Sequence, residues 1–523
     1  MPLSRLLLFA LTMMLSAVTG CASATAGRLS ASQPAPRTET EYLAIFVEGQ
    51  KIGYGKSTRI VEADKVTNRQ FMRVTIGRAG ISITVQQSET SIETPDGRPL
   101  GFLSVQDMGA YRTKIEGTVS PSGQVKVATW TGPWAATLPA STQPGPGTSM
   151  PAATQPGLVT EKTMEWPKGA LMAEGLRLMT LKQGSREGTT WQAQLFMPSA
   201  LAAWQTTVVV GAMTDVDLLG RKTRLREVRS TTKSPGGEIA ATTYVDDELS
   251  PQKTVVDMMG MKLEMITCGR EFALSPNDTV DFFDKLLLAS PTPLENVGSV
   301  KSAVYRLQRT GKTNLLIPST DNQTVVAGRG GVIEVTVTPV AAAKGERFPY
   351  RGKDPAALEA LKPNRFVQGD HAEVVALACK AIGDTTDAAE AGRRIEKFVR
   401  QYINKKNLAV GYASAVEVAR SREGDCTEHA VLVAAMCRSV GIPCQVVNGL
   451  GYVSQMAGRK DVFGPHAWAQ AYIGGKWVGL DAALNGFDAG HITLAAGGGD
   501  PEDFFGVTQS LGMFKIVAVE LKE

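Results

Sequence analysis

Three segments of this chain are the most informative about its fold: Arg422-Glu-Gly-Asp-Cys-Thr-Glu-His429, Gly464-Pro-His-Ala-Trp468 and Leu480-Asp481. They supply a cysteine, a histidine and an aspartate in that order. Nucleophilic catalysis by cysteine needs a thiolate, a base that generates it and a third group that orients the base. The three segments therefore predict a nucleophilic cysteine site.

The residues around Cys426 predict that it begins a helix. Gly424 interrupts the preceding segment, Asp425 is a favourable N-cap, and Glu428 stands at the capping-box position. No helix breaker follows before Gly441. Unpaired N–H groups at a helix N-terminus stabilise a thiolate. A lone cysteine more often merely packs, but the histidine and aspartate that follow Cys426 favour the catalytic interpretation.

The same helix is predicted to be buried, because residues 430–436 are apolar on every side. Two neighbours of Cys426 oppose a thiolate, since the negative charges of Asp425 and Glu428 raise a thiol pKa. A positive partner is therefore required.

Residues 466–473 and 476–480 alternate in polarity on either side of the turn signal Gly474-Gly475. This pattern predicts a β-hairpin in which Ile473 faces Lys476. One face of the hairpin is small and apolar and suits a packed helix; it carries Ala467, Ala469, Ala471, Ile473, Val478 and Leu480.

The same register places Trp468 opposite Asp481, with His466 as the diagonal neighbour of that carboxylate. Diagonal residues on one face lie about 7–8 Å apart at Cα, within reach of a carboxylate–imidazole contact. A slip of one residue would separate the two side chains.

These residues resemble the transglutaminase-like superfamily, whose members have a papain-like fold with a Cys-His-Asp triad. The resemblance runs from Tyr350 to the C-terminus. It is carried by Phe398-Val-Arg-Gln-Tyr402, Ala415-Val-Glu-Val418, Glu423-Gly-Asp-Cys-Thr-Glu-His-Ala430, Gly441-Ile-Pro443, Gly464-Pro-His-Ala-Trp468 and Trp477-Val-Gly-Leu-Asp481. It implies Cys426 as nucleophile, His466 as general base and Asp481 as orienting acid.

The chain departs from bacterial members of the family at three places near the site. They usually carry an arginine at the position of Gln445, an acidic residue at Gln470 and Pro-Thr at Ala482-Ala483. Family members include cross-linking enzymes, peptidases, amidases, deamidases and proteins that have lost catalysis. The preferred acceptor, water or an amine, therefore stays open.

Four further side chains on the His466 face of the hairpin are candidates for lining the substrate site: Trp468, Gln470, Tyr472 and Trp477. The aromatic members either form an apolar acceptor tunnel or simply pack. His429, on the helix of Cys426, likewise either lines the site or packs.

The N-terminus predicts export. Arg5 precedes a short apolar run that leads into Val18-Thr-Gly-Cys21, which resembles the signal of a bacterial lipoprotein. We expect a signal peptide over 1–20, a lipid-modified Cys21, a flexible tether over 21–40 and a periplasm-facing protein anchored in the cell envelope. The alternative is an ordinary signal peptide cleaved after Ala22-Ser-Ala24.

The composition is that of a globular protein. The net charge is +4 over 523 residues, with both signs interspersed, so nucleic-acid binding is not expected. An oxidising compartment would allow a disulfide between Cys437 and Cys444, on either side of a Gly-Ile-Pro turn. Cys268 and Cys379 are expected to be buried and unpaired.

Neither a metal nor a cofactor is predicted. His371, His429 and His491 lack Cys or His partners at the spacings of metal ligands. Acyl transfer through a thioester uses side chains alone.

The expected architecture is α+β. A β-rich region over 41–284, interrupted by a Pro/Gly-rich disordered insertion at 138–159, precedes a further β segment at 285–345 and a papain-like catalytic domain at 346–523. The β-rich region is either one large antiparallel sheet or a duplicated one, and serves as a scaffold or recognition module.

The sequence thus predicts an envelope-anchored cysteine acyl-transfer enzyme that acts on amide bonds of a protein or peptide substrate, as a peptidase, amidase or transamidase. The alternative is a non-catalytic envelope scaffold or binding protein that retains a transglutaminase-like domain.

Overall fold

The computed structural model describes residues 36–78, 81–108, 111–133, 158–234, 237–258, 260–278, 285–310, 315, 317–406, 413–484, 486–500, 507 and 510–523. The predicted signal peptide, Cys21, and residues 138–157 of the predicted insertion lie outside these ranges. Among the helices within them, none combines the length and apolar character that crossing a bilayer requires. The described chain forms two compact units, 36–77 with 82–278, and 285–523.

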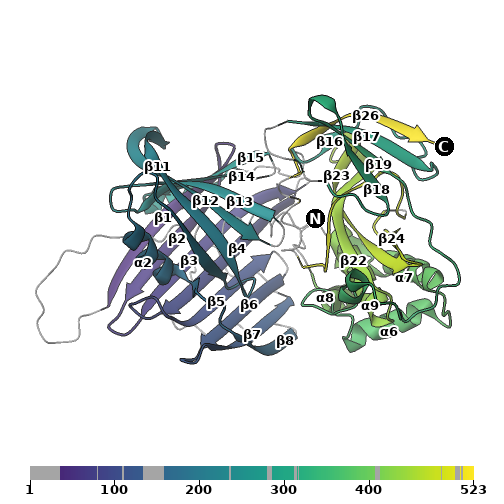
Figure 1. Ribbon diagram of the computed structural model, residues 1–523, viewed down its shortest axis with the longest axis horizontal. Coiled ribbons are helices and arrows are strands. Elements are labelled where there is room, and N and C mark those ends of the chain that lie inside the picture. The colour runs from purple at the N-terminus through teal and green to yellow at the C-terminus, as the bar shows by residue number, and fades with distance from the viewer. Residues whose placement is uncertain are drawn as a thin grey trace, which may run out of the picture. The chain divides into compact units, whose positions relative to one another are not determined.

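The N-terminal unit is built on one sheet that has fifteen strands within the described residues (Figure 1). In sheet order these are β8 (Leu158–Glu165), β7 (Gln124–Pro133), β6 (Tyr111–Val119), β5 (Pro99–Met108), β4 (Ile81–Glu93), β3 (Val66–Arg78), β2 (Gln50–Val61), β1 (Arg37–Val47), β15 (Met261–Cys268), β14 (Pro251–Met258), β13 (Gly237–Val245), β12 (Arg221–Ser234), β11 (Ala202–Leu218), β10 (Thr190–Met197) and β9 (Ala170–Leu171). Two short helices accompany them, α2 (Ala173–Gln183) and α3 (Arg270–Ala273).

The path of this sheet consists of two meanders. Strands β1 to β8 follow one another outward on one side, and β15 to β9 do so on the other. The meanders meet where β1 pairs with β15 in antiparallel register, with Tyr42 opposite Cys268. Of the two arrangements expected for this region, a single large sheet or a duplicated one, the structure contains the single sheet.

Alternation along the strands separates the two faces of the sheet. In β4, every second residue from Ile83 to Glu93 is buried. The buried side chains change along the strand from apolar, at Ile83 and Val85, to polar, at Glu89 and Glu93.

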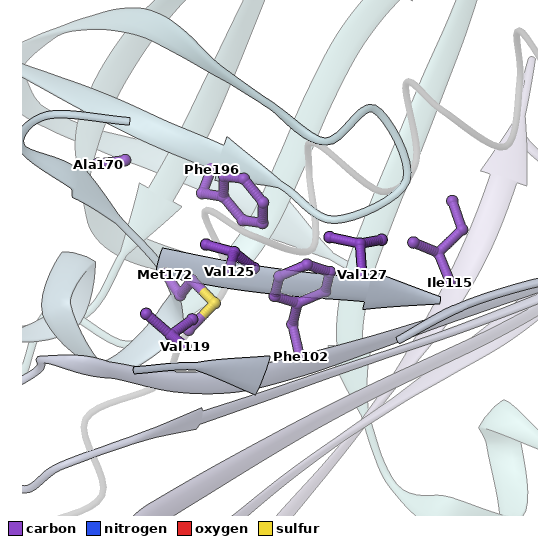
Figure 2. Packing of buried hydrophobic residues seen from close by; sticks show 8 residues of the cluster. All are labelled: Phe102, Ile115, Val119, Val125, Val127, Ala170, Met172 and Phe196. Atoms are coloured by element: carbon purple, nitrogen blue, oxygen red, sulfur yellow. The ribbon is translucent and has the colours of Figure 1, made fainter. Parts of the chain in front are cut away.

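An apolar cluster fills the region between β5, β6, β7 and β10 (Figure 2). Figure 2 shows the Phe102 ring lying below Phe196 and beside Val125 and Val127, and the two ring centroids are 5.0 Å apart. Gly117 makes room for Phe102, because a Cβ there would lie 2.1 Å from the ring. Each buried side chain of this size contributes about 1.5–3 kcal/mol to stability.

The C-terminal unit mixes helices and strands. Its helices are α5 (Pro355–Glu359), α6 (Ala372–Ile382), α7 (Ala388–Tyr402), α8 (Ala415–Ser421) and α9 (Cys426–Ser439), with a 3₁₀ turn η1 (Arg329–Gly331). Its strands are β16 (Leu288–Ala289), β17 (Ser302–Arg309), β18 (Gln323–Ala327), β19 (Val332–Val337), β20 (Lys405–Lys406), β21 (Glu423–Gly424), β22 (Cys444–Met456), β23 (Arg459–Ile473), β24 (Lys476–Leu480), β25 (His491–Gly497) and β26 (Phe514–Lys522).

Within the described residues, the strands of this unit form two main sheets. One has the order β16-β23-β22-β25 with β24 on β23, and the other has the order β18-β19-β17-β26. The second sheet joins β17, β18 and β19 of segment 285–345 to the C-terminal strand β26, whereas β16 of that segment pairs with β23 in the first sheet. The predicted α+β class, a large antiparallel β region followed by mixed helices and strands, is confirmed.

The helices lie on the small apolar face of the hairpin formed by β23 and β24. Helix α9 contacts β22 and β23. In α7, a Cβ at Gly392 would lie within 4 Å of the Leu480 and Ile473 side chains, which belong to that face. The apolar face therefore packs against α7, while α9, which begins at Cys426, packs against β22 and β23.

Candidate active site

Cys426 is the first residue of α9, as the sequence predicts. Both halves of the capping box form: the Asp425 carboxylate accepts a hydrogen bond from the Thr427 amide at 2.8 Å, and Glu428 accepts one from the Asp425 amide at 2.9 Å. Gly424 permits this close packing, because a Cβ there would lie 2.3 Å from the Glu428 Cβ. The helix start is thus built from local contacts.

Glu428 caps α9 and also binds a backbone amide outside that helix. Its side chain is fully buried, and its second oxygen accepts a hydrogen bond from the Ala413 amide at 3.0 Å. Burial, followed by the charge of Asp425, raises the pKa of Glu428 well above its usual range. This shift weakens the opposition of Glu428 to a thiolate at Cys426 and leaves Asp425 as the stronger of the two acidic neighbours.

The hairpin register is the predicted one. Ile473 faces Lys476, and the pairing runs on to Ala469 opposite Leu480. At the next step along the hairpin, the Nε2 atom of His466 lies 2.8 Å from the Oδ2 atom of Asp481. The predicted contact between these two buried side chains is confirmed.

The other side of the His466 ring forms a hydrogen bond with the Cys426 thiol. Because Nε2 faces Asp481, the nitrogen left for the sulfur is Nδ1. The structure therefore brings the three predicted residues together, in the order sulfur, imidazole and carboxylate.

The electrostatic interactions among Cys426, His466 and Asp481 favour a thiolate, an imidazolium and a carboxylate. Burial lowers the pKa of His466, but the charge and hydrogen bond of Asp481 outweigh it and, with Cys426, raise it to about 10. Burial raises the pKa of Asp481, but His466 holds it well below its usual range. Burial and the Asp425 charge raise the pKa of Cys426, whereas the hydrogen bond and charge of His466 lower it.

Hydrogen bonds hold both the carboxylate and the backbone of Asp481. Its Oδ1 atom accepts hydrogen bonds from the amides of Ala483 and Leu484, at 2.8 and 3.1 Å. Its own amide donates to Glu396 at 2.7 Å, and its carbonyl accepts from Arg400 at 2.9 Å. Helix α7, which carries both partners, therefore anchors the backbone of Asp481.

His491 also belongs to this site, although the sequence offers it no Cys or His partner at a metal-ligand spacing. Its Nε2 atom lies 3.0 Å from Asp481 Oδ2, and its Nδ1 atom lies 2.9 Å from Asp488 Oδ1. No spacing rule would have found it, because its place depends on β25 pairing with β22, where His491 faces Gly451.

The ligand atoms of His466, Asp481 and His491 lie within 4.8 Å of one another, which is compact enough to consider a metal ion. Both ring nitrogens, however, converge on one carboxylate oxygen at hydrogen-bond distances. Zinc would need each nitrogen at about 2.0–2.1 Å from a shared centre. The observed geometry is that of a hydrogen-bonded cluster.

The candidate lining residues fall into two groups. Trp468 is fully buried and stacks on His466, with ring centroids 5.9 Å apart. Tyr472 and Trp477 pack on each other at 5.1 Å. Tyr472 lies six residues along β23 from His466, about 20 Å at the rise of a strand, so this pair is not brought to the sulfur.

Two other polar candidates pack within the domain. The Gln470 side chain is fully buried and accepts a hydrogen bond from Gln445 at 3.0 Å. The Nδ1 atom of His429 lies 2.6 Å from the Asp425 carbonyl, one helical turn earlier. This contact supports the packing role for His429.

The disulfide that the spacing allowed is not formed. Cys437 and Cys444 are both free and buried, and Cys437 forms a side-chain hydrogen bond with Cys444. This hydrogen bond and burial raise the pKa of Cys437 well above its usual range. The two sulfurs form a packed thiol pair instead of the covalent bond of about 2.05 Å that a disulfide needs.

Comparison with known proteins places the site within a family. Residues 375–482 match the model of the transglutaminase-like superfamily. No curated protein matches the chain.

Solved structures resemble parts of the chain. A candidate cysteine protease from Cytophaga hutchinsonii is 18% identical, with a TM-score of 0.28, over 42% of this chain and 86% of that one. A β-barrel-like protein of a domain of unknown function from Brucella abortus is 15% identical, with a TM-score of 0.28, over 45% and 95%. A candidate protease from Parabacteroides distasonis is 12% identical, with a TM-score of 0.19, over 78% and 66%. Residues 375–482, which contain Cys426, His466 and Asp481, are a transglutaminase-like superfamily domain.

Proposed function

We propose that this protein is a cysteine acyl-transfer enzyme that cleaves amide bonds of a protein or peptide through a thioester on Cys426. The observation that carries the proposal is the continuous chain from the Cys426 thiol through His466 to Asp481, all held by buried elements. Hydrolysis, as in a peptidase or amidase, and transamidation differ only in the acceptor that resolves the thioester.

The reaction begins with transfer of the Cys426 proton to His466. The thiolate attacks the carbonyl carbon, and the carbonyl oxygen becomes an oxyanion. We assign its stabilisation to the amide of Cys426, because the first N–H groups of a helix have no intrahelical acceptor. His466 then gives its proton to the leaving nitrogen, and the C–N bond breaks to leave the thioester.

The second half restores the enzyme. Water, or a primary amine, attacks the thioester carbonyl while His466 takes one of its protons. The C–S bond breaks and the thiolate–imidazolium pair forms again. Asp481 stabilises the imidazolium in both halves and keeps the ring oriented through Nε2.

A peptide-library screen with and without an added primary amine tests this proposal. We expect the native protein to turn over amide substrates and Cys426→Ala to lose that activity. Cys379→Ala is the matched control, because this cysteine lies on α6 and is exposed, in contrast to the burial expected from the sequence. Equal turnover by the native protein and Cys426→Ala would contradict the proposal, and amine incorporation would identify a transamidase.

The alternative is a non-catalytic scaffold, and the large fifteen-stranded sheet of the described residues supports this alternative. Alkylation of Cys426 across a pH series separates the two. A thiol that reacts with an apparent pKa near 8.5, about the ordinary value, would support the scaffold.

We also propose that the protein is exported and anchored in the cell envelope through a lipid on Cys21. The support is the sequence Val18-Thr-Gly-Cys21 after a short apolar run.

A further inference from the structure

Asp481 accepts hydrogen bonds from two histidines through the same oxygen. His466 Nε2 and His491 Nε2 lie 2.8 and 3.0 Å from Oδ2, while the amides of Ala483 and Leu484 occupy Oδ1. The carboxylate therefore faces four donors. The mechanism above uses only His466, which leaves the role of His491 to be explained.

His491 has a carboxylate on each side of its ring. The Nδ1 atom lies 2.9 Å from Asp488 Oδ1, a shorter contact than the 3.3 Å to the Asp488 amide. A neutral imidazole has only one N–H, whereas an imidazolium donates from both nitrogens. Burial lowers the pKa of His491, but hydrogen bonds and charges of Asp481 and Asp488 raise it overall.

Packing and a loop hydrogen bond also restrict the position of the His491 ring. Its centroid lies 4.8 Å from that of Phe487 and 5.2 Å from that of Trp468. The loop before it is tied down by the Tyr305 hydroxyl, which donates to the Ala489 carbonyl at 2.6 Å. His491 is therefore a rigid donor to Asp481.

We propose that His491 is a positioning residue of this site: as an imidazolium between Asp481 and Asp488, it fixes the Asp481 carboxylate and weakens the hold of that carboxylate on the His466 proton. The inference rests on the proposed function. Two observations carry it, the shared oxygen and the 5.6 Å between the centroids of the two histidine rings. An imidazolium that releases its proton more readily is a better acid for the leaving amine.

The groups around His491 determine which substitutions are informative. The titratable and charged side chains that face it, directly or through Asp481, are Asp481, Asp488, His466, Cys426, Tyr305, Glu396 and Arg400. Burial raises the pKa of Tyr305, so this phenol contributes no charge. Changing His491 therefore isolates the charge at issue, and changing Asp488 tests what keeps that charge on the ring.

Two variants remove that charge by different routes. His491→Gln keeps a donor near the Nε2 position, and Asp488→Asn keeps the imidazole but removes the anion that favours its protonation. The rate of Cys426 alkylation by iodoacetamide is measured against pH by mass spectrometry of the Cys426 peptide. The change in alkylation rate at alkaline pH, called the alkaline step below, marks loss of the His466 proton.

We expect the alkaline step to move up by roughly two pH units in His491→Gln, from the Coulomb repulsion between two cations at this separation in an effective dielectric of about 20. The rise is smaller in Asp488→Asn, because that change also removes an anion. The turnover number falls several-fold while KM stays constant, because His466 becomes a weaker acid. His371→Gln is the matched control: it makes the same substitution at the N-cap of α6, where the imidazole contacts the Glu373 amide, and leaves the step in place.

The outcomes are distinct. An unmoved alkaline step in both variants, with melting temperatures retained and the native thiolate still present at low pH, reduces His491 to a packing role and leaves the proposed function intact. A single native transition near the ordinary thiol value of about 8.5 means that the Cys426–His466 pair does not form, and overturns both proposals.

Discussion

At the scale of single residues, Asp481 connects most of the site. Its carboxylate orients His466, contacts His491 and accepts two backbone amides, while its own backbone is tied to α7. A side chain with so many buried partners tolerates little change in charge, because each partner would be left with an unmatched donor.

Asp481→Asn is expected to lower turnover by up to about 10⁴-fold, the size of effect seen when the orienting acid of a triad becomes an amide. The loss arises because the amide disfavours the correct imidazole tautomer. Glu396→Gln is the control, since its amide oxygen still accepts from the Asp481 backbone. Steady-state kinetics of both variants test this, and comparable rates in the two would rule out an orienting role for Asp481.

The raised pKa of His466 predicts the pH dependence. Activity should fall as pH rises through about 10, because His466 then lacks the proton for the leaving amine. The same shift favours folding: the folded pKa lies above the unfolded value, so the stabilisation is complete below about 6.5 and is lost as pH rises through the folded pKa. A rate profile whose alkaline limb lies near neutral pH would contradict the Asp481–His466 pairing.

At the scale of elements, α9 and the hairpin position the reacting groups. Helix α9 depends on its cap, and the cap depends on Glu428, which links Asp425 to the Ala413 amide. The hairpin depends on its two-residue turn, which sets the register that joins His466 to Asp481.

Glu428→Ala should destabilise the C-terminal unit by about 1–3 kcal/mol, the cost of leaving buried amides unpaired and losing half of a capping box. Glu428→Gln should cost much less, because a neutral side chain already suits this burial. Urea unfolding of the full chain, followed by tryptophan fluorescence, measures the difference. Equal stability of the two variants would mean that the carboxyl contacts contribute little.

At the scale of the whole molecule, both units bury polar side chains. Those of the C-terminal unit include His466, Asp481 and His491 of the candidate site, and those of the N-terminal unit include Gln87, Glu89, Ser91 and Glu93 of β4. Glu89 is among these, and it accepts a hydrogen bond from Gln87 at 3.0 Å.

Burial raises the pKa of Glu89 to about 7, so the N-terminal unit should be less stable at high pH. The folded pKa exceeds the unfolded value, and stability is therefore lost as pH rises from about 4.3 through about 7. Glu89→Gln should remove up to about 3 kcal/mol of this dependence. Calorimetric melting of the full chain between about pH 5 and pH 8 tests it, with the exposed Glu161→Gln as control; identical pH slopes would contradict the prediction.

Lipid anchoring also acts on the whole molecule. The native protein should partition with membranes, and Cys21→Ala should release it or leave it uncleaved, because two or more acyl chains are needed for firm attachment. Fractionation of expressing cells measures this. A soluble mature form that begins near Thr25 would favour the ordinary signal peptide.

The sequence by itself determined the features that arise from contacts close in the chain. The start of α9 follows from Asp425 and Glu428, and the meeting of His466 with Asp481 follows from alternation around a two-residue turn. Capping and turn geometry involve only a few residues, so their patterns are visible without a fold.

Tertiary structure alone decided the rest. His491 reaches Asp481 because β25 lies beside β22, and the pKa of Glu428 is raised because the side chain is buried, with one oxygen on the Ala413 amide. The β1–β15 pairing that unites the large sheet likewise joins strands more than two hundred residues apart. Such contacts follow no local period: they depend on which elements pack together, and that choice is made by burial of the whole molecule's apolar faces.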